Sequence, residues 1–170
     1  IRIGYNDGDQ GTGTLTVDGT GSTVVQSGAS TLTVGNADTP GNNGSHTLHV
    51  QNGGIFTTGT GAITINKTGT VNLTSSGTLN ANGNITVEMF TASNSAIAYI
   101  GDSYELDDAT TFTINSDAGF YLESDLNVGN GTDGTLIVDG AGSQLLTNQS
   151  DSAALDRRHV QRQLDRTGGA

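Results

Sequence analysis

Residues 13–22 read Gly-Thr-Leu-Thr-Val-Asp-Gly-Thr-Gly-Ser, and residues 134–143 read Gly-Thr-Leu-Ile-Val-Asp-Gly-Ala-Gly-Ser, so eight of the ten positions are identical. The residues ahead of each copy also correspond, because Ile-Arg-Ile-Gly at 1–4 matches Leu-Asn-Val-Gly at 126–129. A self-similar chain of short apolar runs separated by Gly and Asn is typical of a solenoid, in which each unit buries its apolar edge against its neighbours. We therefore expect a stack of similar coils.

Four short runs alternate apolar, polar and apolar residues, and they begin at positions 15, 32, 48 and 63, which are 17, 16 and 15 residues apart. This period of two predicts strands with one buried face. We expect the first residues of the four runs to stack inward in one ladder and the third residues in another. The polar middle residues are then expected to point outward: Thr16, Thr33, His49 and Thr64.

Regular strand spacing without a helical pattern predicts an all-β chain, a parallel β-helix or β-solenoid with a unit of strand, corner, strand and loop. The Gly-rich links at 18–21 and 51–54 supply the positive φ angles that corners need. Between 67 and 110 the pattern loosens, and the acidic stretch 102–108 is predicted to be a loop that leaves the solenoid. Alternation returns from 111 to 125, where four residues are expected to point inward: Phe112, Ile114, Phe120 and Leu122.

Composition limits the function. Against 6 basic residues the chain has 17 acidic ones, for a net charge of −11, which argues against nucleic acid or an anionic membrane as partner. With no Cys there is no disulfide and no thiolate metal site. No apolar run approaches the roughly 20 residues that would insert in a membrane. The chain lacks an initiator Met and a signal peptide, and we expect it to be a fragment or mature segment.

The motifs at 13–22, 32–36, 50–54, 126–130 and 134–143 resemble the repeat of autotransporter (type V secretion) passenger regions and of related exported proteins with PEP-CTERM sorting signals. The resemblance is clear over 1–65 and 126–146 and weak between them. It implies a right-handed parallel β-helix, secretion to the bacterial cell surface, and a stalk or adhesive role. The repeat itself has no catalytic signature.

Four carboxylates are the candidate catalytic residues of the alternative function, a carbohydrate-active or other hydrolytic enzyme built on a β-helix. Glu123 and Asp125 are expected on the outer face of a strand from 120 to 125, with Tyr121 beside them. Residues i and i+2 of a strand lie roughly 7 Å apart, and paired carboxylates hydrolyse glycosides. Asp102 and Glu105 complete the set. The competing interpretation is a solvated acidic edge that discourages aggregation.

Asn6, Asp7 and Asp9 are candidate Ca²⁺ ligands, since they place oxygen side chains at nearby positions in a loop that contains Gly. The loop lacks the bidentate Glu of a full calcium loop, and the calcium-binding nonapeptide does not recur. An ordinary turn rich in Asn, Asp and Gly is the favoured interpretation, and no cofactor is expected.

Two further constellations are weak. His46, His49, Ser45 and Asp38 suggest a nucleophilic set, but alternation places His49 outward and His46 inward, and no nucleophile elbow is present. Thr-x-Thr pairs resemble the flat faces of ice-binding solenoids, although Thr is also a common outward strand residue and three residues interrupt the rank: His49, Asn66 and Glu88. The pairs are Thr14/Thr16, Thr31/Thr33 and Thr111/Thr113.

Residues 151–170 form an atypical tail behind a solenoid domain at 1–150, with four of the six basic residues: Arg157, Arg158, Arg162 and Arg166. One interpretation is a short capping helix that begins at Ser152 and ends at Gly168, with Leu155, His159 and Leu164 inward. The other is an out-of-frame extension, because a shifted frame from Leu155 can encode a further repeat.

The repeat explains most positions and leaves no convergent nucleophile, base and oxyanion donor. We therefore expect a structural or adhesive module that contacts surface glycans or proteins. Open coil ends predict self-association as well.

Overall fold

In a computed structural model the chain forms a β-solenoid, and the structure describes residues 1–4, 11–35, 44–129 and 133–147. The tail at 151–170, with its predicted helix, lies outside the described residues. The described part is all-β, its strand pairs are parallel, and none of its segments forms a helix that could cross a membrane. The predicted parallel β-helix is thus confirmed.

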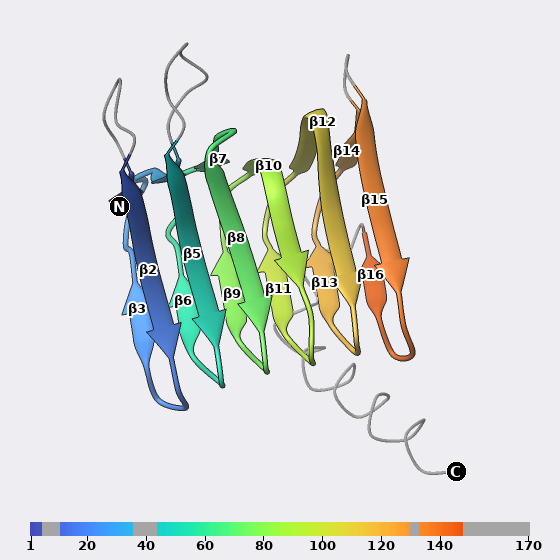
Figure 1. Cartoon of the computed structure of the whole chain (residues 1–170), viewed down its shortest axis with the longest axis horizontal. Helices are drawn as coiled ribbons and strands as arrows, with labels where there is room; N and C mark the ends of the chain where they lie inside the picture. The colour runs from blue at the N-terminus through green and yellow to red at the C-terminus, as the bar shows by residue number, and fades with distance from the viewer. Residues whose placement is uncertain (5–10, 36–43, 130–132, 148–170) are drawn as a thin grey trace.

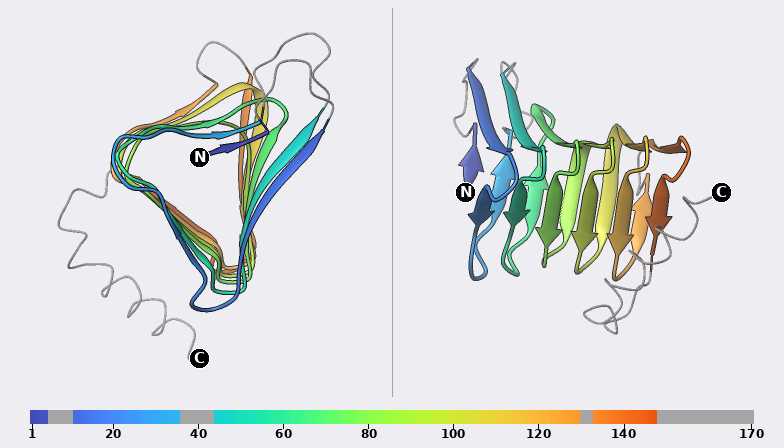
Figure 2. Two further views of the ribbon diagram at one scale, coloured as in Figure 1. Left: turned by 90° about the vertical axis from the view of Figure 1, so that its left-hand side faces the viewer. Right: turned by 90° about the horizontal axis from the view of Figure 1, so that it is seen from below.

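The strands stack coil on coil into three faces around a triangular cross-section (Figure 2). Near-side strands such as β2 run downward in Figure 1, far-side strands such as β3 run upward, and the chain advances to the right, which is a right-handed winding. We name the faces after their first strands. The β1 face comprises β1 (Arg2–Ile3), β4 (Leu32–Val34), β7 (Ile63–Ile65), the starts of β10 (Ile85–Ala92) and β12 (Tyr104–Asn115), and β14 (Leu126–Val128).

The strands of the other two faces, the β2 face and the β3 face, are also stacked in the order of the coils. The ends of β10 and β12 pass onto the β2 face, and β10 does so through a register shift between Val87 and Met89. The β2 face also contains β2 (Thr12–Asp18), β5 (Ser45–Gln51), β8 (Gly69–Thr74) and β15 (Gly134–Asp139). The β3 face contains β3 (Thr23–Val25), β6 (Ile55–Thr57), β9 (Thr78–Ala81), β11 (Ile97–Ile100), β13 (Gly119–Leu122) and β16 (Gln144–Leu146).

The prediction that four runs form common ladders is wrong. Leu15 stacks on Leu48 on the β2 face, whereas Leu32 stacks on Ile63 on the β1 face. The spacing of about 16 residues is therefore half a coil, because each coil carries two such strands on different faces. The alternation itself is confirmed, and Leu32, Leu48 and Ile63 are all buried.

The sequence repeat corresponds to equivalent places in the first and last coils. Residues 13–22 and 134–143 cover β2 and β15 with the corners that follow them. Gly19 and Gly140 both have a φ of 91°, and in both corners a serine hydroxyl donates a hydrogen bond to a backbone oxygen four residues earlier, over 2.5 and 2.6 Å. The same sequence thus gives the same corner at the two ends.

An aromatic cluster fills the middle coils, where the aliphatic pattern loosens. Phe90, Tyr104, Phe112 and Phe120 are all fully buried, and their ring centroids lie 4.7–6.3 Å apart. The expected inward positions of Phe112, Ile114, Phe120 and Leu122 are confirmed. The loop predicted for 102–108 is wrong, because β12 begins at Tyr104, and Tyr104 and Leu106 point inward.

Candidate functional site

The corner between the β3 and β1 faces brings together three of the four candidate carboxylates. Asp102 lies in this corner in one coil, and Glu123 and Asp125 lie in it in the next. The two coils are joined by backbone hydrogen bonds: the Glu123 N–H donates to the Ile100 carbonyl, and the Tyr104 N–H donates to the Asp125 carbonyl, each over 2.9 Å. The corner therefore forms an acidic edge on the outside of the solenoid.

The strand that was expected to carry Glu123 and Asp125 ends at Leu122. Glu123 consequently lies in a bend and Asp125 in the link before β14, and the predicted placement of two carboxylates along one strand face is wrong. Asp125 is exposed and Glu123 is half-buried. Asp102 is exposed, and its carboxylate accepts a hydrogen bond from the Ser103 N–H over 2.8 Å.

Glu105 lies away from this corner, on β12 in the β1 face, between Thr86 and Asn127 of the neighbouring coils. A hollow of about 380 Å³ opens beside the corner, and of the four candidate carboxylates only Asp125 lines it. Its other lining residues in the described part are Ser124, Leu126, Asn127 and Thr147. The carboxylates thus form an edge and do not converge on a shared groove in the described residues.

Two stacked tyrosines adjoin the acidic corner on the outside of the β3 face. The rings of Tyr99 and Tyr121 lie 5.1 Å apart with an interplanar angle of 18°. A Cβ atom on Gly119 would lie 2.8 Å from Cε2 of Tyr121, so glycine leaves room for that ring. Burial, and then the neighbouring Tyr99, raise the pKa of the Tyr121 hydroxyl. Sequence analysis placed Tyr121 beside the carboxylates but missed Tyr99, which is its neighbour only through the coil register.

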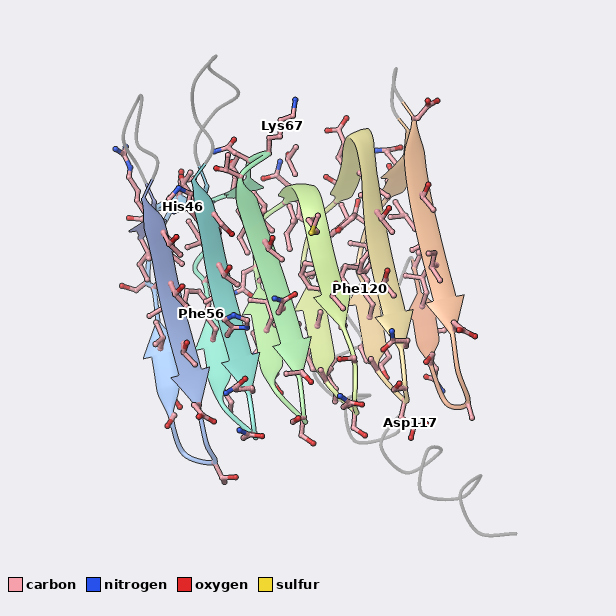
Figure 3. The ribbon with its side chains drawn as sticks, viewed as in Figure 1. His46, Phe56, Lys67, Asp117 and Phe120 are labelled. Carbon is pink, nitrogen blue, oxygen red and sulfur yellow. The ribbon has the colours of Figure 1, made fainter. Side chains whose placement is uncertain are left out.

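Among the described residues, His46 and His49 do not form a hydrolytic set with Ser45. His46 lies at the start of β5 (Figure 3), its side chain is buried, and its Nδ1 accepts a hydrogen bond from the Gly13 N–H over 3.1 Å. His49 and Ser45 lie on the opposite, outward side of β5, as alternation predicts for His49. Asp38 lies outside the described residues.

The threonine pairs are distributed over two faces. Thr14, Thr16, Thr111 and Thr113 belong to the β2 face, whereas Thr33 belongs to the β1 face. Thr14 and Thr16 each begin a row of outward residues that stack from coil to coil, and residues other than Thr interrupt both of these ranks. The interruptions in these ranks are Met89, His49, Asn72 and Ile137. The ranks therefore do not form a continuous hydroxyl lattice.

The metal candidates Asn6, Asp7 and Asp9 lie outside the described residues. Within the described ranges, no three His, Asp or Glu side chains are grouped so that they could hold a metal ion. Comparison with known proteins found no matching family model, no matching curated protein and no matching solved structure.

Proposed function

We propose that this chain is an exported structural or adhesive module of a bacterial cell surface, a stretch of solenoid within a longer autotransporter-like protein. The proposal combines the resemblance of its repeat to autotransporter passengers with the coil-on-coil arrangement of its strands. The β-solenoid fold is shown, and export and adhesion are the steps that we add to it.

The observation that carries the proposal is that every strand pair in the described part joins neighbouring coils. A solenoid built in this way can fold progressively from one end, because each coil needs only the coil beside it. Such a fold suits a chain that crosses a membrane unfolded and folds as it emerges. It requires no disulfide, and the chain has no Cys.

The outer surface supports contact with glycans or proteins. Outward positions of the β2 face are mainly Thr, interrupted by His49, Asn72, Met89 and Ile137, and the β3 face adds the half-buried Tyr99, which stacks on the buried Tyr121. These side chains offer hydroxyl, amide and aromatic groups on two of the three faces. Repeated shallow contacts of this type suit adhesion, in which several weak contacts act together.

The alternative is a carbohydrate-active enzyme that uses the acidic corner. Asp102, Glu123 and Asp125 lie in neighbouring coils there, which is the observation in its favour. Glycoside hydrolysis needs one carboxylic acid and one carboxylate on opposite sides of a bound sugar. The three groups instead share one convex edge, and we therefore rank adhesion first.

One experiment separates the two functions. Beads coated with the protein are exposed to immobilised acidic and neutral polysaccharides, while the soluble protein is incubated with the same polysaccharides and assayed for new reducing ends. We expect retention of the beads without turnover. Turnover that disappears in Glu123→Ala or Asp125→Ala but persists in Glu105→Ala would establish the enzyme instead.

Export is tested separately by fusing the chain to a signal peptide and a translocator of the autotransporter type in a Gram-negative bacterium. The expected result is chain on the cell surface that added protease can digest. Accumulation of the fusion in the periplasm would contradict the export part of the proposal.

A further inference from the structure

The outer side of the β3 face differs from the other two faces in its side chains and in the charges beside it. Its outward positions in the middle coils include four apolar or aromatic residues: Ile55, Ile97, Tyr99 and Tyr121. We propose that this face binds a basic amphipathic helix of a partner protein, laid along the axis of the solenoid. The inference rests on the proposed adhesive role, for which it names a partner and a surface.

Apolar outward side chains gather on this face through the coil register. Ile55 and Ile97 belong to one outward row, and Tyr99 and Tyr121 belong to the next. The outward row of the β1 face is instead polar throughout: Arg2, Thr33, Thr64, Thr86, Glu105 and Asn127. Apolar side chains gathered on one side of an otherwise polar surface are typical of a contact with another molecule.

Three of the four side chains expose part of their surface, and the fourth supports them. Ile55, Ile97 and Tyr99 are half-buried, whereas Tyr121 is 8% exposed. The ring of Tyr121 stacks on that of Tyr99 with 5.1 Å between the centroids, which fixes the orientation of the Tyr99 ring. We call Ile55, Ile97 and Tyr99 the apolar floor. An aromatic ring also attracts a guanidinium group, so Tyr99 suits an Arg as well as an apolar side chain.

Carboxylates border the floor on both sides. Asp117 lies at the corner before β13 (Figure 3), and Glu123 lies at the corner after it. Asp102 and Asp125 join Glu123 at the second corner. Asp102, Asp117 and Asp125 are exposed. The coils of β11 and β13 thus hold the stacked tyrosines between two acidic edges.

No basic group offsets these charges nearby. Within the described residues, neither the β3 face nor its two corners contain Lys, Arg or His. Arg2 lies in the β1 face, and Lys67 lies at the corner between the β1 and β2 faces. The β3 face therefore attracts a cationic partner and repels a second copy of this chain, whose net charge is −11.

The width of the face matches a helix. Asp117 and Glu123 are six positions apart in one coil, which corresponds to at most about 20 Å of extended chain. A helix with its side chains is about 10–12 Å across. A helix that lies on the apolar floor therefore brings Arg or Lys on its flanks to both acidic edges, because these long side chains extend beyond the apolar stripe.

The length of the floor matches as well. From β6 to β13 the face advances by three strand spacings, or about 14 Å, and a helix covers this distance in about ten residues. Apolar residues at i, i+3, i+4 and i+7 of one helix fall within that length. A cationic polysaccharide would match the carboxylates, but it presents no continuous apolar stripe to Ile55 and Ile97. A basic amphipathic helix fits both features of the face.

Fluorescence anisotropy of a labelled peptide, titrated with the full chain, tests the proposal. The peptide is an amphipathic helix of about 18 residues, or five turns, with Leu along one stripe and Arg on both flanks. A scrambled peptide of the same composition keeps the charge and lacks the stripe. We expect the amphipathic peptide to bind several-fold more tightly than the scrambled one, and its binding to weaken as salt is added.

Substitutions on the β3 face should weaken binding, whereas matched ones elsewhere should not. Asp117→Asn and Tyr99→Thr are each expected to weaken binding several-fold. Asp133→Asn removes an exposed carboxylate at the corner between the β1 and β2 faces, and Met89→Thr removes an exposed apolar side chain from the β2 face. Both controls should bind as the unaltered chain does. Circular dichroism checks that the variants are folded, and Ile97→Thr replaces Tyr99→Thr if the latter is not.

Three results would overturn the proposal: no binding of the amphipathic peptide, equal binding of the two peptides, or equal losses in the variants and their controls. Equal binding of the two peptides would indicate a preference for cationic chains in general. Failure of this inference is distinguishable from failure of the adhesive role. Beads that are retained on polysaccharides while the peptide does not bind would leave adhesion standing and refute the helical partner.

Discussion

The imidazole ring of His46 occupies the space that a side chain on Gly4 would need. An ideal Cβ atom on Gly4 would lie 1.9 Å from Nδ1 of His46, and one on Gly44 would lie 2.8 Å from Nε2. The Gly13 N–H donates a hydrogen bond to Nδ1 over 3.1 Å. A large polar ring is thus accommodated inside the first coils because its neighbours are glycines.

We expect Gly4→Ala to destabilise the protein much more than Gly21→Ala. Both glycines have positive φ, 70° and 88°, so both substitutions incur a similar backbone penalty. Only Gly4 is close to a buried ring, because nothing lies within 4 Å of a Cβ on Gly21. Overpacking should add about 1–3 kcal/mol to the loss for Gly4→Ala.

Urea unfolding followed by circular dichroism measures both losses. A double variant, Gly4→Ala with His46→Ala, should recover part of the extra loss because it removes the ring that the new methyl group meets. Equal losses for Gly4→Ala and Gly21→Ala would contradict the steric explanation.

Tyr104→Phe is expected to leave stability unchanged or to raise it by about 1 kcal/mol. The hydroxyl of Tyr104 is buried and has no hydrogen-bond partner within the described residues, and an unsatisfied buried polar group costs about 1–3 kcal/mol. Phenylalanine keeps the ring contacts with Phe112 and Phe120. The midpoint of urea unfolding at neutral pH checks this, with Tyr104→Leu as the control that should lose stability. A loss of more than about 1 kcal/mol in Tyr104→Phe would indicate a partner for the hydroxyl.

The stability of the protein should fall in alkali, and Tyr104 should account for part of the fall. Burial raises the pKa of the Tyr104 hydroxyl well above its ordinary value of 10.0. Above about pH 10 the unfolded chain therefore releases a proton that the folded chain retains, and stability decreases as the pH rises.

Urea unfolding of the unaltered chain and of Tyr104→Phe, measured from about pH 8 to about pH 11, tests this origin. The two stability curves should be parallel below about pH 10 and diverge above it, with the steeper loss in the unaltered chain. Parallel curves over the whole range would assign the alkaline loss to other groups.

Alternation predicts the parallel strands and the inward residues, because the period of two is a local property of each strand. The number of strands in a coil depends on which strands pair with each other between neighbouring coils. The corners determine this pairing, because they direct the chain from one face to the next. Leu15 and Leu32 have the same local pattern, yet they lie on different faces. The sequence spacing alone cannot distinguish a coil from half a coil.

The candidate site shows the same limit. Tyr99 is next to Tyr121, and Asp102 lies in the same corner as Glu123, only because coils of different lengths place them in register. The acidic composition of 102–108 favoured a loop, but burial of Tyr104 and Leu106 stabilises a strand in spite of the charged residues between and after them. Long-range packing therefore overrides local composition at this position.

One corner recurs in successive coils with different sequences. Asn52 and Gly53 have positive φ in one coil, and Ser75 and Ser76 occupy the equivalent positions in the next, with φ of 49° and 62°. The Gly53 N–H donates to the Ser75 carbonyl over 3.1 Å, which joins the two corners. The glycine at position 53 identifies the first corner in the sequence, whereas the serines at 75 and 76 give no such signal for the second corner. The corner at Ser75 therefore lacks the Asn-Gly signal of the corner before it.

Ser76→Gly should therefore stabilise the protein by about 0.5–1 kcal/mol. A left-handed conformation costs a residue with a side chain about 1–2 kcal/mol, and glycine avoids this cost but loses about 0.4–1 kcal/mol through the greater freedom of its unfolded chain. Ser27 is exposed and does not have positive φ, so Ser27→Gly is the matched control and should reduce stability slightly. The midpoints of urea unfolding for the two variants should move in opposite directions from that of the unaltered chain. A shift of the same sign and size in both would show that the left-handed corner at Ser76 is not a source of strain.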